Sequence, residues 1–477
     1  MTMLSSSTHL AGPTEPSFLQ ALRFGKNPIA YLEQCAERYG HCFSLNLPGD
    51  QPKIACSHPE DVRRIFALKP DDFTAASNAL PAPIGDGSLL FMDGDEHLQE
   101  RKMMAPMLLG ERLSEYGELM KQTTDEVTDR WSSGESYVVH EAMREISLKV
   151  IVKCIFGIVE QQRIEHICQV TNDWLELAFS PALFTIGLLL PAQKLRAVLD
   201  RAAQRSLARY AGHSPAWRIF PWQRLIDRKA ALIALLKEEM QRCRREADSK
   251  RADILALMVA GKHEDGSAPS DERIVDQLIT MLVGGHETTA NAMSWALSYM
   301  LPRPDVMAKV KAELAATFAG GAFALTGVRR LTYLDACIQE SMRMLPVPLA
   351  ISRVLLRPLE LSKCVAPAGS NVWACMHLTQ RRPELWPEPH SFRPERFLPD
   401  NEPKADPGLA IPRESNYPFG GGRRRCLGMS FANYEMRVVL SRLLLRTSLR
   451  ITPDSHPQPL FRGVSFTPGD TLRVVRD

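Results

Sequence analysis

One long helical segment constrains the fold of this chain more than any other feature of its sequence. The stretch "PSDERIVDQLITMLVGGHETTANAMSWALSYM" has Ser270 as the expected N-cap, followed by Asp271 and Glu272 in the first turn. The segment continues for about thirty residues, which is long enough to cross a whole domain. The sequence therefore predicts a buried central helix, with the rest of a large domain packed around it.

The middle of this helix contains residues that weaken helical structure. Gly284 and Gly285 are adjacent, and Thr288 and Thr289 are both β-branched, which together cost the helix roughly 2 kcal/mol relative to alanine. A buried helix tolerates this where some group must lie against its backbone. We expect a threonine hydroxyl to bond the carbonyl four residues back, near Gly284, which bends the helix and opens a notch. The alternative is a glycine contact with a crossing helix.

The same segment excludes one class of metal site. The sequence "HETTA" begins like the H-E-x-x-H motif of zinc hydrolases, but its fifth position is Ala290. The second histidine ligand is missing, so the segment does not indicate a zinc hydrolase.

The other segments predict a mainly α fold with small β-sheets. From about 94 to 315 the pattern is almost entirely helical, whereas residues 1–70 mix short alternating strands with helix. Beyond 345, short β-like runs alternate with loops, and a last helix is expected over roughly 427–445. The chain has no repeat, low-complexity tract or flexible linker. We therefore expect a single large domain over 1–477.

Composition excludes several classes of protein. The formal net charge is only +3, from 58 Lys+Arg and 55 Asp+Glu, which argues against a dedicated nucleic-acid binder. The ten cysteines are scattered and contain no CxxC pair, as in a reduced chain without a zinc knuckle. Residues 1–18 lack a secretory pattern, and no apolar stretch reaches the ~18 residues needed to span a bilayer. We expect a cytoplasmic protein without a transmembrane segment, and a flexible N-terminus over 1–18.

The stretch "FGGGRRRCLG" at 419–428 is too rich in glycine and arginine to be ordinary helix. Three kinds of site fit such a stretch. They are a glycine loop that grips phosphate, a basic patch for nucleic acid, and a glycine turn that presents Cys426 to a metal. The composition argues against the second.

Taken together with the central helix, this loop makes the chain resemble the cytochrome P-450 superfamily of haem-thiolate monooxygenases, of the soluble bacterial type. "FGGGRRRCLG" fits the loop motif F-x-x-G-x-R-x-C-x-G at every fixed position, and Glu340 and Arg343 match the E-x-x-R element. Arg353 follows at the usual distance, residues 394–397 match the meander, and "GDEHLQERKMMAP" matches the helix that carries haem-propionate ligands. The resemblance spans about residues 20–475.

The resemblance implies that the chain binds haem b (iron protoporphyrin IX) with Cys426 as the axial thiolate ligand. The thiolate donates electrons that favour cleavage of a bound O–O bond. Backbone N–H groups and the dipole of the following helix stabilise such an anionic sulfur. Glycines over 420–422 permit a tight turn, Gly428 permits close packing of the next helix, and Phe419 is expected to shield the sulfur.

The resemblance also assigns roles to charged residues. Arg424 occupies the propionate-binding position, and His97, Arg101 and Arg353 are expected to reach the propionates from other sides. Many relatives have tryptophan where His97 stands. A buried structural triad of charges behind the cysteine loop is expected at Glu340, Arg343 and Arg396.

The implied activity is an O2-dependent monooxygenase that hydroxylates or otherwise oxidises an apolar small molecule. O2 is expected beside the haem in the notch at Gly284 and Gly285, where Thr288 orients protons and Glu287 relays them from solvent. One alternative is a peroxide-using peroxygenase or isomerase, but such enzymes often lose this acid–alcohol pair. Another is a haem-based sensor or carrier, which leaves the pair unexplained.

The chain lacks its own electron-transfer module. It has neither a G-x-G-x-x-G after a strand nor clustered cysteines. We therefore expect a ferredoxin or flavodoxin, with an NAD(P)H-dependent reductase, as partner. A basic rim for this partner is expected at Arg423, Arg425 and Lys102.

The expected walls of the substrate site are mostly apolar, which fits a lipid, a terpenoid or another secondary metabolite. An uncharged segment at 177–192 falls where the family has a mobile lid, although core packing is the alternative. The expected walls come from 74–93, 170–225, 281–288, 346–352 and Phe461–Phe466.

Overall fold

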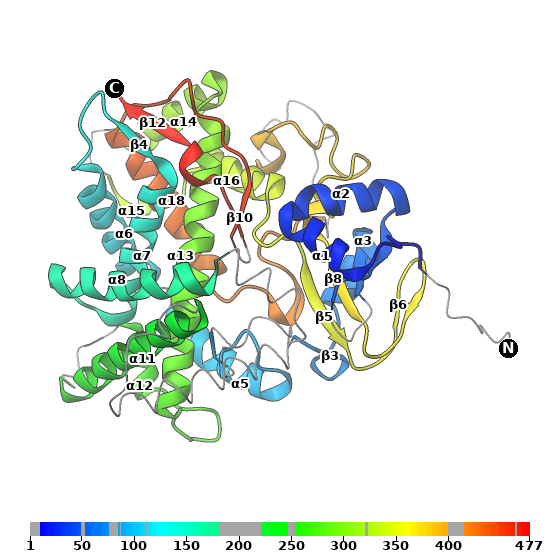
Figure 1. The fold of residues 1–477 in the computed structure, drawn as a ribbon. Helices are drawn as coiled ribbons and strands as arrows, with labels where there is room; N and C mark the ends of the chain where they lie inside the picture. Colours follow the sequence, from blue (N-terminus) through cyan, green and yellow to red (C-terminus); the bar gives the residue numbers. More distant parts are fainter. Residues whose placement is uncertain are drawn as a thin grey trace, which may run out of the picture.

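The computed structural model describes residues 10–48, 53–75, 84–85, 87–110, 112–180, 221–246, 251, 253–319, 323–398, 415–462 and 465–477. These residues form a larger helical part beside a smaller part that holds the main β-sheet (Figure 1). This agrees with the predicted mainly α fold with small sheets. The expected lid over 177–192 lies outside the described residues from 181 onward.

Helices make up most of the larger part. Between it and the smaller part lies α5 (Gly94–Met104) (Figure 1), and α17 (Met376–Thr379) packs against α2 (Pro28–Tyr39). The helices of the larger part are α6 (Arg112–Thr128), α7 (Val139–Phe156), α8 (Gln161–Ala178), α11 (Pro221–Arg245), α12 (Ile254–Ala260), α13 (Asp271–Met300), α14 (Pro304–Thr317), α15 (Leu325–Val328), α16 (Thr332–Met344) and α18 (Met429–Arg446).

The predicted central helix is α13. It runs for 30 residues, and the Ser270 hydroxyl accepts a hydrogen bond from the N–H of Arg273 at 3.2 Å, as an N-cap does. Asp271 and Glu272 stand in its first turn, where acidic side chains complement the helix dipole. Most residues of α13 are buried, and the helix packs against α7, α16 and α18. The sequence-based prediction of a central helix is confirmed.

The smaller part is built on a five-stranded sheet with the strand order β1-β2-β8-β5-β3. Its β2 pairs in parallel with β8, and the other pairs are antiparallel. Helices α1 (Ser17–Lys26), α2 (Pro28–Tyr39) and α3 (Pro59–Phe66) accompany it (Figure 1). The strands are β1 (Cys42–Leu45), β2 (Lys53–Cys56), β3 (Phe73–Thr74), β5 (Ile351–Leu355) and β8 (Asn371–Ala374).

Three smaller sheets complete the described structure. A three-stranded sheet has the order β4-β12-β9, and two hairpins pair β6 with β7 and β10 with β11. Their strands are β4 (Ser136–Val138), β6 (Leu359–Glu360), β7 (Val365–Ala366), β9 (Leu449–Ile451), β10 (Leu460–Arg462), β11 (Ser465–Thr467) and β12 (Arg473–Arg476).

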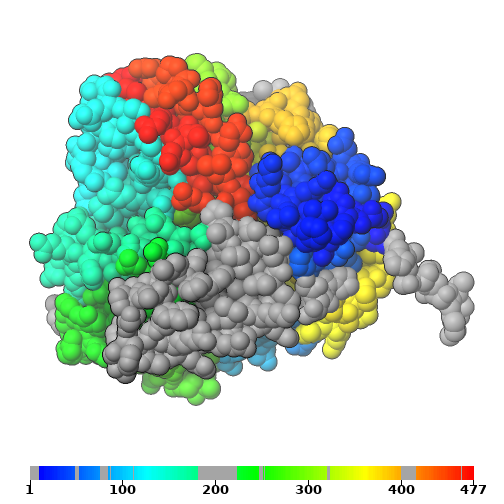
Figure 2. All heavy atoms as spheres, viewed as in Figure 1, coloured from blue at the N-terminus to red at the C-terminus, as the bar shows by residue number. Residues whose placement is uncertain are grey.

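Part of the N-terminal segment that was expected to be flexible is packed against the sheet. The N–H of Ser44 donates to the carbonyl of Ala11, and the Gln20 amide donates to the carbonyls of Pro13 and Glu15. A Cβ at Gly12 would lie 2.2 Å from the Ser44 carbonyl oxygen. Residues 10–12 therefore lie against β1 and residues 13–15 against α1, and the N-terminal residues (blue) occupy one side of the molecule in Figure 2.

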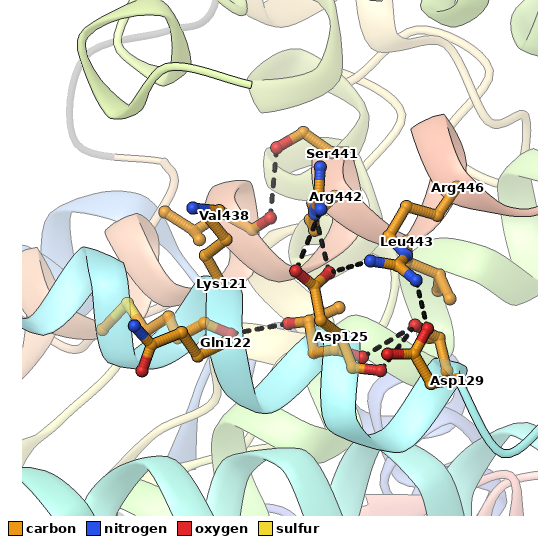
Figure 3. A network of polar contacts seen from close by, with 12 residues as sticks. Lys121, Gln122, Asp125, Asp129, Val438, Ser441, Arg442, Leu443 and Arg446 are labelled. Carbon is orange, nitrogen blue, oxygen red and sulfur yellow. Dashed lines mark hydrogen bonds and ion pairs between the residues drawn. The ribbon is translucent and has the colours of Figure 1, made fainter. Parts of the chain in front are cut away.

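Ion pairs fasten α18, the helix that follows the cysteine loop, to α6. Asp125 accepts hydrogen bonds from Arg442 at 2.7 and 2.9 Å and pairs with Arg446 at 2.9 Å (Figure 3). Arg446 also pairs with Asp129. These side chains are partly exposed, so each pair contributes little alone. The shared carboxylate of Asp125 nevertheless fixes the lateral position of α18.

A buried charge triad holds α16 against the meander, as the family resemblance implies. Glu340 accepts from Arg343 at 2.7 and 2.9 Å and from Arg396 at 3.3 Å, and the three side chains are at most 2% exposed. The remaining guanidinium donors bond carbonyl oxygens, among them that of Gln380 at 2.8 Å. Charges buried this deeply are stable only when all are paired.

No helix among the described residues is both long and apolar enough to cross a membrane.

Candidate active site

The cysteine loop is a closed turn that only glycine can form at several positions. The N–H of Cys426 donates to the carbonyl of Phe419 at 2.9 Å, which closes the loop. Gly420 and Gly422 have φ values of 69° and 66°, in the left-handed region that favours glycine. A Cβ at Gly422 would lie 1.8 Å from the carbonyl oxygen of Phe66. The predicted tight turn is present, and it packs directly on the end of α3.

The loop presents the sulfur of Cys426 at an open face. All ten cysteines lie in the described residues; eight are buried, Cys364 is half-buried and Cys426 is exposed. The protein around the other sides of this thiol raises its pKa, which a backbone hydrogen bond from Gly428 and the cations Arg101 and Arg425 partly offset. The helix α18 begins at Met429, two residues later than predicted, with Gly428 as its N-cap. One backbone donor and two cations thus favour the thiolate, against the opposing effect of burial.

Four basic side chains from three segments gather beside this cysteine. Burial, together with the charges of Arg424 and Arg101, lowers the pKa of His97 to about 4. Burial and neighbouring arginines likewise lower the pKa values of Arg353 and Arg424 to about 10. Asp93 is the acidic group that acts on them, and it raises the pKa of Arg424. The mutually repelling positive charges of the three arginines form a site for anionic groups such as carboxylates, beside the neutral His97.

The partners of these basic groups differ. Arg424 donates to the carbonyl oxygens of Leu89 at 3.2 Å and Leu90 at 2.9 Å, and it lies 3.3 Å from a carboxylate oxygen of Asp93. Arg353 lies over the ring of Phe73, 5.0 Å from its centroid. Arg101 makes no hydrogen bond or ion pair with any residue that the structure describes. Its guanidinium remains available to a ligand, and its charge acts on the thiol of Cys426.

The hydrogen bond that the sequence predicts within α13 is present. The Thr288 hydroxyl donates to the carbonyl of Gly284 at 2.6 Å, four residues back. Gly284 is exposed although most of the helix is buried, and a Cβ there would meet nothing within 4 Å. At Gly285 the alternative holds, because a Cβ there would lie 3.2 Å from Ile151 of α7. One glycine therefore opens the notch, and the next permits a helix contact.

Comparisons with known proteins agree on one family. The family model described as Cytochrome P-450 matches residues 11–472. Cytochrome P-450 135B1 of Mycobacterium tuberculosis is 30% identical over 466 residues, which cover 97% of this chain and 90% of that protein. Cytochrome P-450 138 of the same organism is 30% identical over 461 residues, which cover 96% and 94%. The structure of the retinoic acid bound cyanobacterial CYP120A1 has a TM-score of 0.80 at 21% identity and 98% coverage of both chains.

The chain belongs to the cytochrome P-450 family. It is therefore a haem-dependent oxidoreductase of the monooxygenase type, which acts on a small molecule and receives electrons from redox partners. The residues of this cytochrome P-450 fit an iron porphyrin. They offer a thiol for the metal at Cys426, cations for the two propionates, and open glycine backbone at Gly284 and Gly428.

Glu287 of this cytochrome P-450 is held away from the threonine that sequence reasoning paired it with. Its carboxylate accepts from Arg144 of α7 at 3.0 Å, and His140 of α7 lies 3.7 Å from the other oxygen. Among the described residues, no hydrogen bond joins Glu287 to Thr288. His286 is fully buried, and burial lowers its pKa to about 3, so it is a neutral packing residue at physiological pH.

Sequence reasoning missed several polar residues around the notch. His140 and Arg144 lie one turn apart on α7, and His140 hydrogen-bonds the Asn291 amide at 2.8 Å. Glu435 of α18 is fully buried, and burial raises its pKa to about 8. The Ser147 hydroxyl beside it donates to the carbonyl of Gly285 at 3.3 Å. The only sequence signal for these contacts was that His140 and Arg144, two polar residues in the apolar α7, are spaced i, i+4 and so lie on the same face of the helix.

Proposed function

We propose that this cytochrome P-450 uses O2 to oxidise an apolar small molecule, with haem held between α13 and the cysteine loop. The observation that supports this best is the convergence of an exposed thiol with four basic side chains. Arg101 belongs to both groups, because its charge acts on the pKa values of Cys426 and His97. A thiol for iron and cations for propionates thus face the same space. The haem supplies O2 binding and the electron relay for oxidation when it is bound.

The proposed roles of the residues follow from their contacts. Cys426 ligates the iron, and the N–H of Gly428 supports the thiolate. Arg101, Arg353, Arg424 and His97 bind the propionates. Phe419, half-buried at the start of the loop, limits the access of water to the sulfur.

An experiment on reductant use separates this function from its alternatives. A monooxygenase should turn over with O2 and NAD(P)H-driven partners, whereas a peroxygenase or isomerase should turn over with peroxide alone. A haem sensor or carrier should do neither. Turnover with peroxide alone, and none with reductant and O2, would contradict the proposal.

Thr288 is proposed to position protons at the notch. We expect Thr288→Ala to keep haem and substrate binding but to divert reducing equivalents into peroxide and water, because the hydroxyl at Gly284 is lost. Losing a positioned proton donor typically costs about 10²–10⁴-fold in rate. Peroxide and product are measured per NAD(P)H consumed. Thr288→Ser should restore coupling, and Thr289→Ala is the matched control at a buried neighbour. A fully coupled Thr288→Ala protein would contradict the role.

Glu287 is proposed to pass protons from solvent toward Thr288. Its carboxylate is only partly exposed, at 22%, and Arg144 holds it on the α7 side of the helix. Delivery to Thr288 therefore requires the carboxylate to leave Arg144. The strength of the Arg144–Glu287 contact therefore also controls how readily Glu287 can pass a proton to Thr288.

The substrate is proposed to be a lipid, a terpenoid or another secondary metabolite. Met281 precedes Gly284 by one helical turn, so this apolar side chain lies on the notch side of α13. Leu349, within the expected wall at 346–352, is also apolar and buried. Binding spectra of the haem protein against a small-molecule library test this class. Tight binding confined to strongly ionic ligands would contradict it.

A ferredoxin or flavodoxin with its NAD(P)H-dependent reductase is the proposed electron source, docking on the cysteine side. Arg423 and Arg425 are exposed there. Lys102, expected to join this rim, is paired with Glu264 at 2.8 Å instead. Its charge is therefore largely neutralised, so the rim depends on the two arginines.

Electron transfer from the partner should slow as salt rises. Exposed charges are screened beyond about 8–10 Å at physiological ionic strength. We expect Arg423→Glu to slow reduction of the haem more than Lys102→Glu, because Lys102 already has an acidic partner. Stopped-flow reduction at several salt concentrations measures this. Arg450→Glu is the control, since Arg450 lies on β9 in the three-stranded sheet with the C-terminal β12. If the rate of haem reduction changes neither with salt nor with Arg423→Glu, the partner does not dock on the cysteine side.

A further inference from the structure

Two thiols and one carboxylate meet in the smaller part of the molecule, and a third thiol lies beside them. Cys42 and Cys56 stand directly opposite each other on the antiparallel strands β1 and β2. Asp61 lies in the first turn of α3, and Cys364 ends the turn of the β6–β7 hairpin. Cys42, Cys56 and Asp61 are fully or almost fully buried. Four segments of the chain thus contribute metal-ligating groups to one place.

The distances within this cluster suit a metal ion. The sulfurs of Cys42 and Cys56 are 3.7 Å apart, and their sulfurs and an Asp61 oxygen all lie within 4.8 Å of one another. Cys364 lies beside this group, close enough for its thiol to act on the pKa of the Cys42 thiol. Two thiolates bound to one tetrahedral Zn²⁺ at about 2.3 Å each lie about 3.8 Å apart. The separation of the first two sulfurs is close to this value, and no disulfide joins them.

The geometry points to a structural zinc site, and we propose that Cys42, Cys56, Cys364 and Asp61 are its four ligands. Three sulfurs and one carboxylate oxygen would give Zn²⁺ four ligands of kinds that it binds, which is the number that a tetrahedral structural site requires. Asp61 is already oriented, because its oxygens accept from the N–H and hydroxyl of Ser362 at 2.7 and 2.5 Å. Such hydrogen bonds to a ligating carboxylate are typical of metal sites.

The charges around the cluster can balance the bound ion. On binding, the three thiols release their protons to solvent, so that Zn²⁺ with three thiolates and one carboxylate carries a net charge of −2. His41 and His58 lie beside it with ring centroids 5.0 Å apart. Lys363 and Arg382 act electrostatically on His41, as Asp61 does, so these cations surround the same place. Their positive charge offsets the net negative charge of the zinc-bound site.

A zinc ion at this site would stabilise α3, the helix against which the cysteine loop packs. Asp61 lies near the N-terminal end of α3, and Phe66 lies at its C-terminal end. The ring of Phe66 would contact a Cβ at Gly421 at 2.8 Å, and its backbone carbonyl excludes one at Gly422. A metal that fixes Asp61 to two strands and a hairpin therefore also fixes the surface on which the Cys426 loop rests.

Two other states of these cysteines are distinguishable from a zinc site. Buried thiols can serve as ordinary apolar packing residues, and these side chains do line an apolar cluster with Val62 and Leu361. Alternatively, Cys42 and Cys56 can be oxidised to a disulfide, in which the sulfurs are about 2.05 Å apart. Neither state binds zinc in a fixed ratio to the protein.

The test counts metal in the full-length, haem-loaded protein. The protein is incubated with Zn²⁺, passed through a desalting column with a mild chelator, and analysed for zinc and iron by mass spectrometry. We expect one zinc per haem iron. Cys42→Ser, Cys56→Ser and Cys364→Ser should each retain zinc at least about tenfold less tightly in competition with a chromophoric chelator. The matched control Cys375→Ser changes another buried thiol, which directly follows β8, and should retain zinc.

A second measurement needs no variant, in case a serine substitution prevents folding. Alkylation of the unaltered protein, with and without prior removal of zinc by a strong chelator and mapped by peptide mass spectrometry, should show that zinc removal speeds alkylation of Cys42, Cys56 and Cys364 but leaves that of Cys375 unchanged. The proposal is overturned by zinc well below one per iron, by equal zinc loss in Cys375→Ser, or by a Cys42–Cys56 disulfide with a mass lower by two hydrogens. It is also overturned by protection that does not distinguish these thiols.

Discussion

In the Cys426→Ser protein, the strongly red-shifted Soret band of the reduced, CO-bound haem should be absent. This band reports a thiolate opposite the CO, and serine cannot supply one. Cys426 is the exposed cysteine of the chain, and the groups that stabilise its thiolate, Gly428 and Arg101, surround it. The measurement is the CO-difference spectrum of the reduced protein.

Matched cysteine variants are the control for this prediction. The other nine cysteines are buried or half-buried, so Cys168→Ser and Cys375→Ser should keep the band. Cys42→Ser should also keep it, even where it loses zinc, which separates the two sites. A Cys426→Ser protein with an unchanged band would remove Cys426 as the iron ligand.

The elements that could be predicted from the sequence are those defined by local chemistry. The notch at Gly284 and Thr288 is such a case, because a threonine hydroxyl reaches the carbonyl four residues back within its own helix. The N-cap at Ser270 is another, since its acceptor and donor are three residues apart. The turn requires positive φ values at Gly420 and Gly422, and glycine at these positions is the sequence signal for such a conformation.

The contacts that could not be predicted join residues far apart in the chain. Glu287 accepts a hydrogen bond from Arg144, which lies 143 residues earlier in the chain. Neither segment contains a sequence pattern that indicates this contact. The pairing of Lys102 with Glu264 similarly removed one member of the expected basic rim. Nothing in the spacing of Cys42, Cys56 and Cys364 marked them as neighbours, because their proximity arises from strand register and a distant hairpin.

The Glu340→Gln protein should lose haem and stability together. Replacing this carboxylate leaves the charges of Arg343 and Arg396 without a counterion in a site at most 2% exposed. Such a loss typically costs about 3–5 kcal/mol of unfolding free energy. The matched control is Glu264→Gln, which breaks the exposed pair with Lys102 and should cost about 0–1 kcal/mol. Urea titrations that follow both haem absorbance and far-ultraviolet circular dichroism measure these costs.

Haem should be lost because the triad connects to the cysteine loop through one side chain. Arg343 donates to the backbone carbonyl of Gln380 at 2.8 Å, and the Gln380 amide donates back to the carbonyl of Arg343 at 3.1 Å. The same amide accepts from the N–H of Tyr417 at 3.1 Å, two residues before the loop begins at Phe419. Gln380→Leu removes this link but keeps the charges paired, so haem release should occur at lower urea with a smaller loss of stability. If Glu340→Gln and Glu264→Gln release haem at the same urea concentration, the triad does not support the loop.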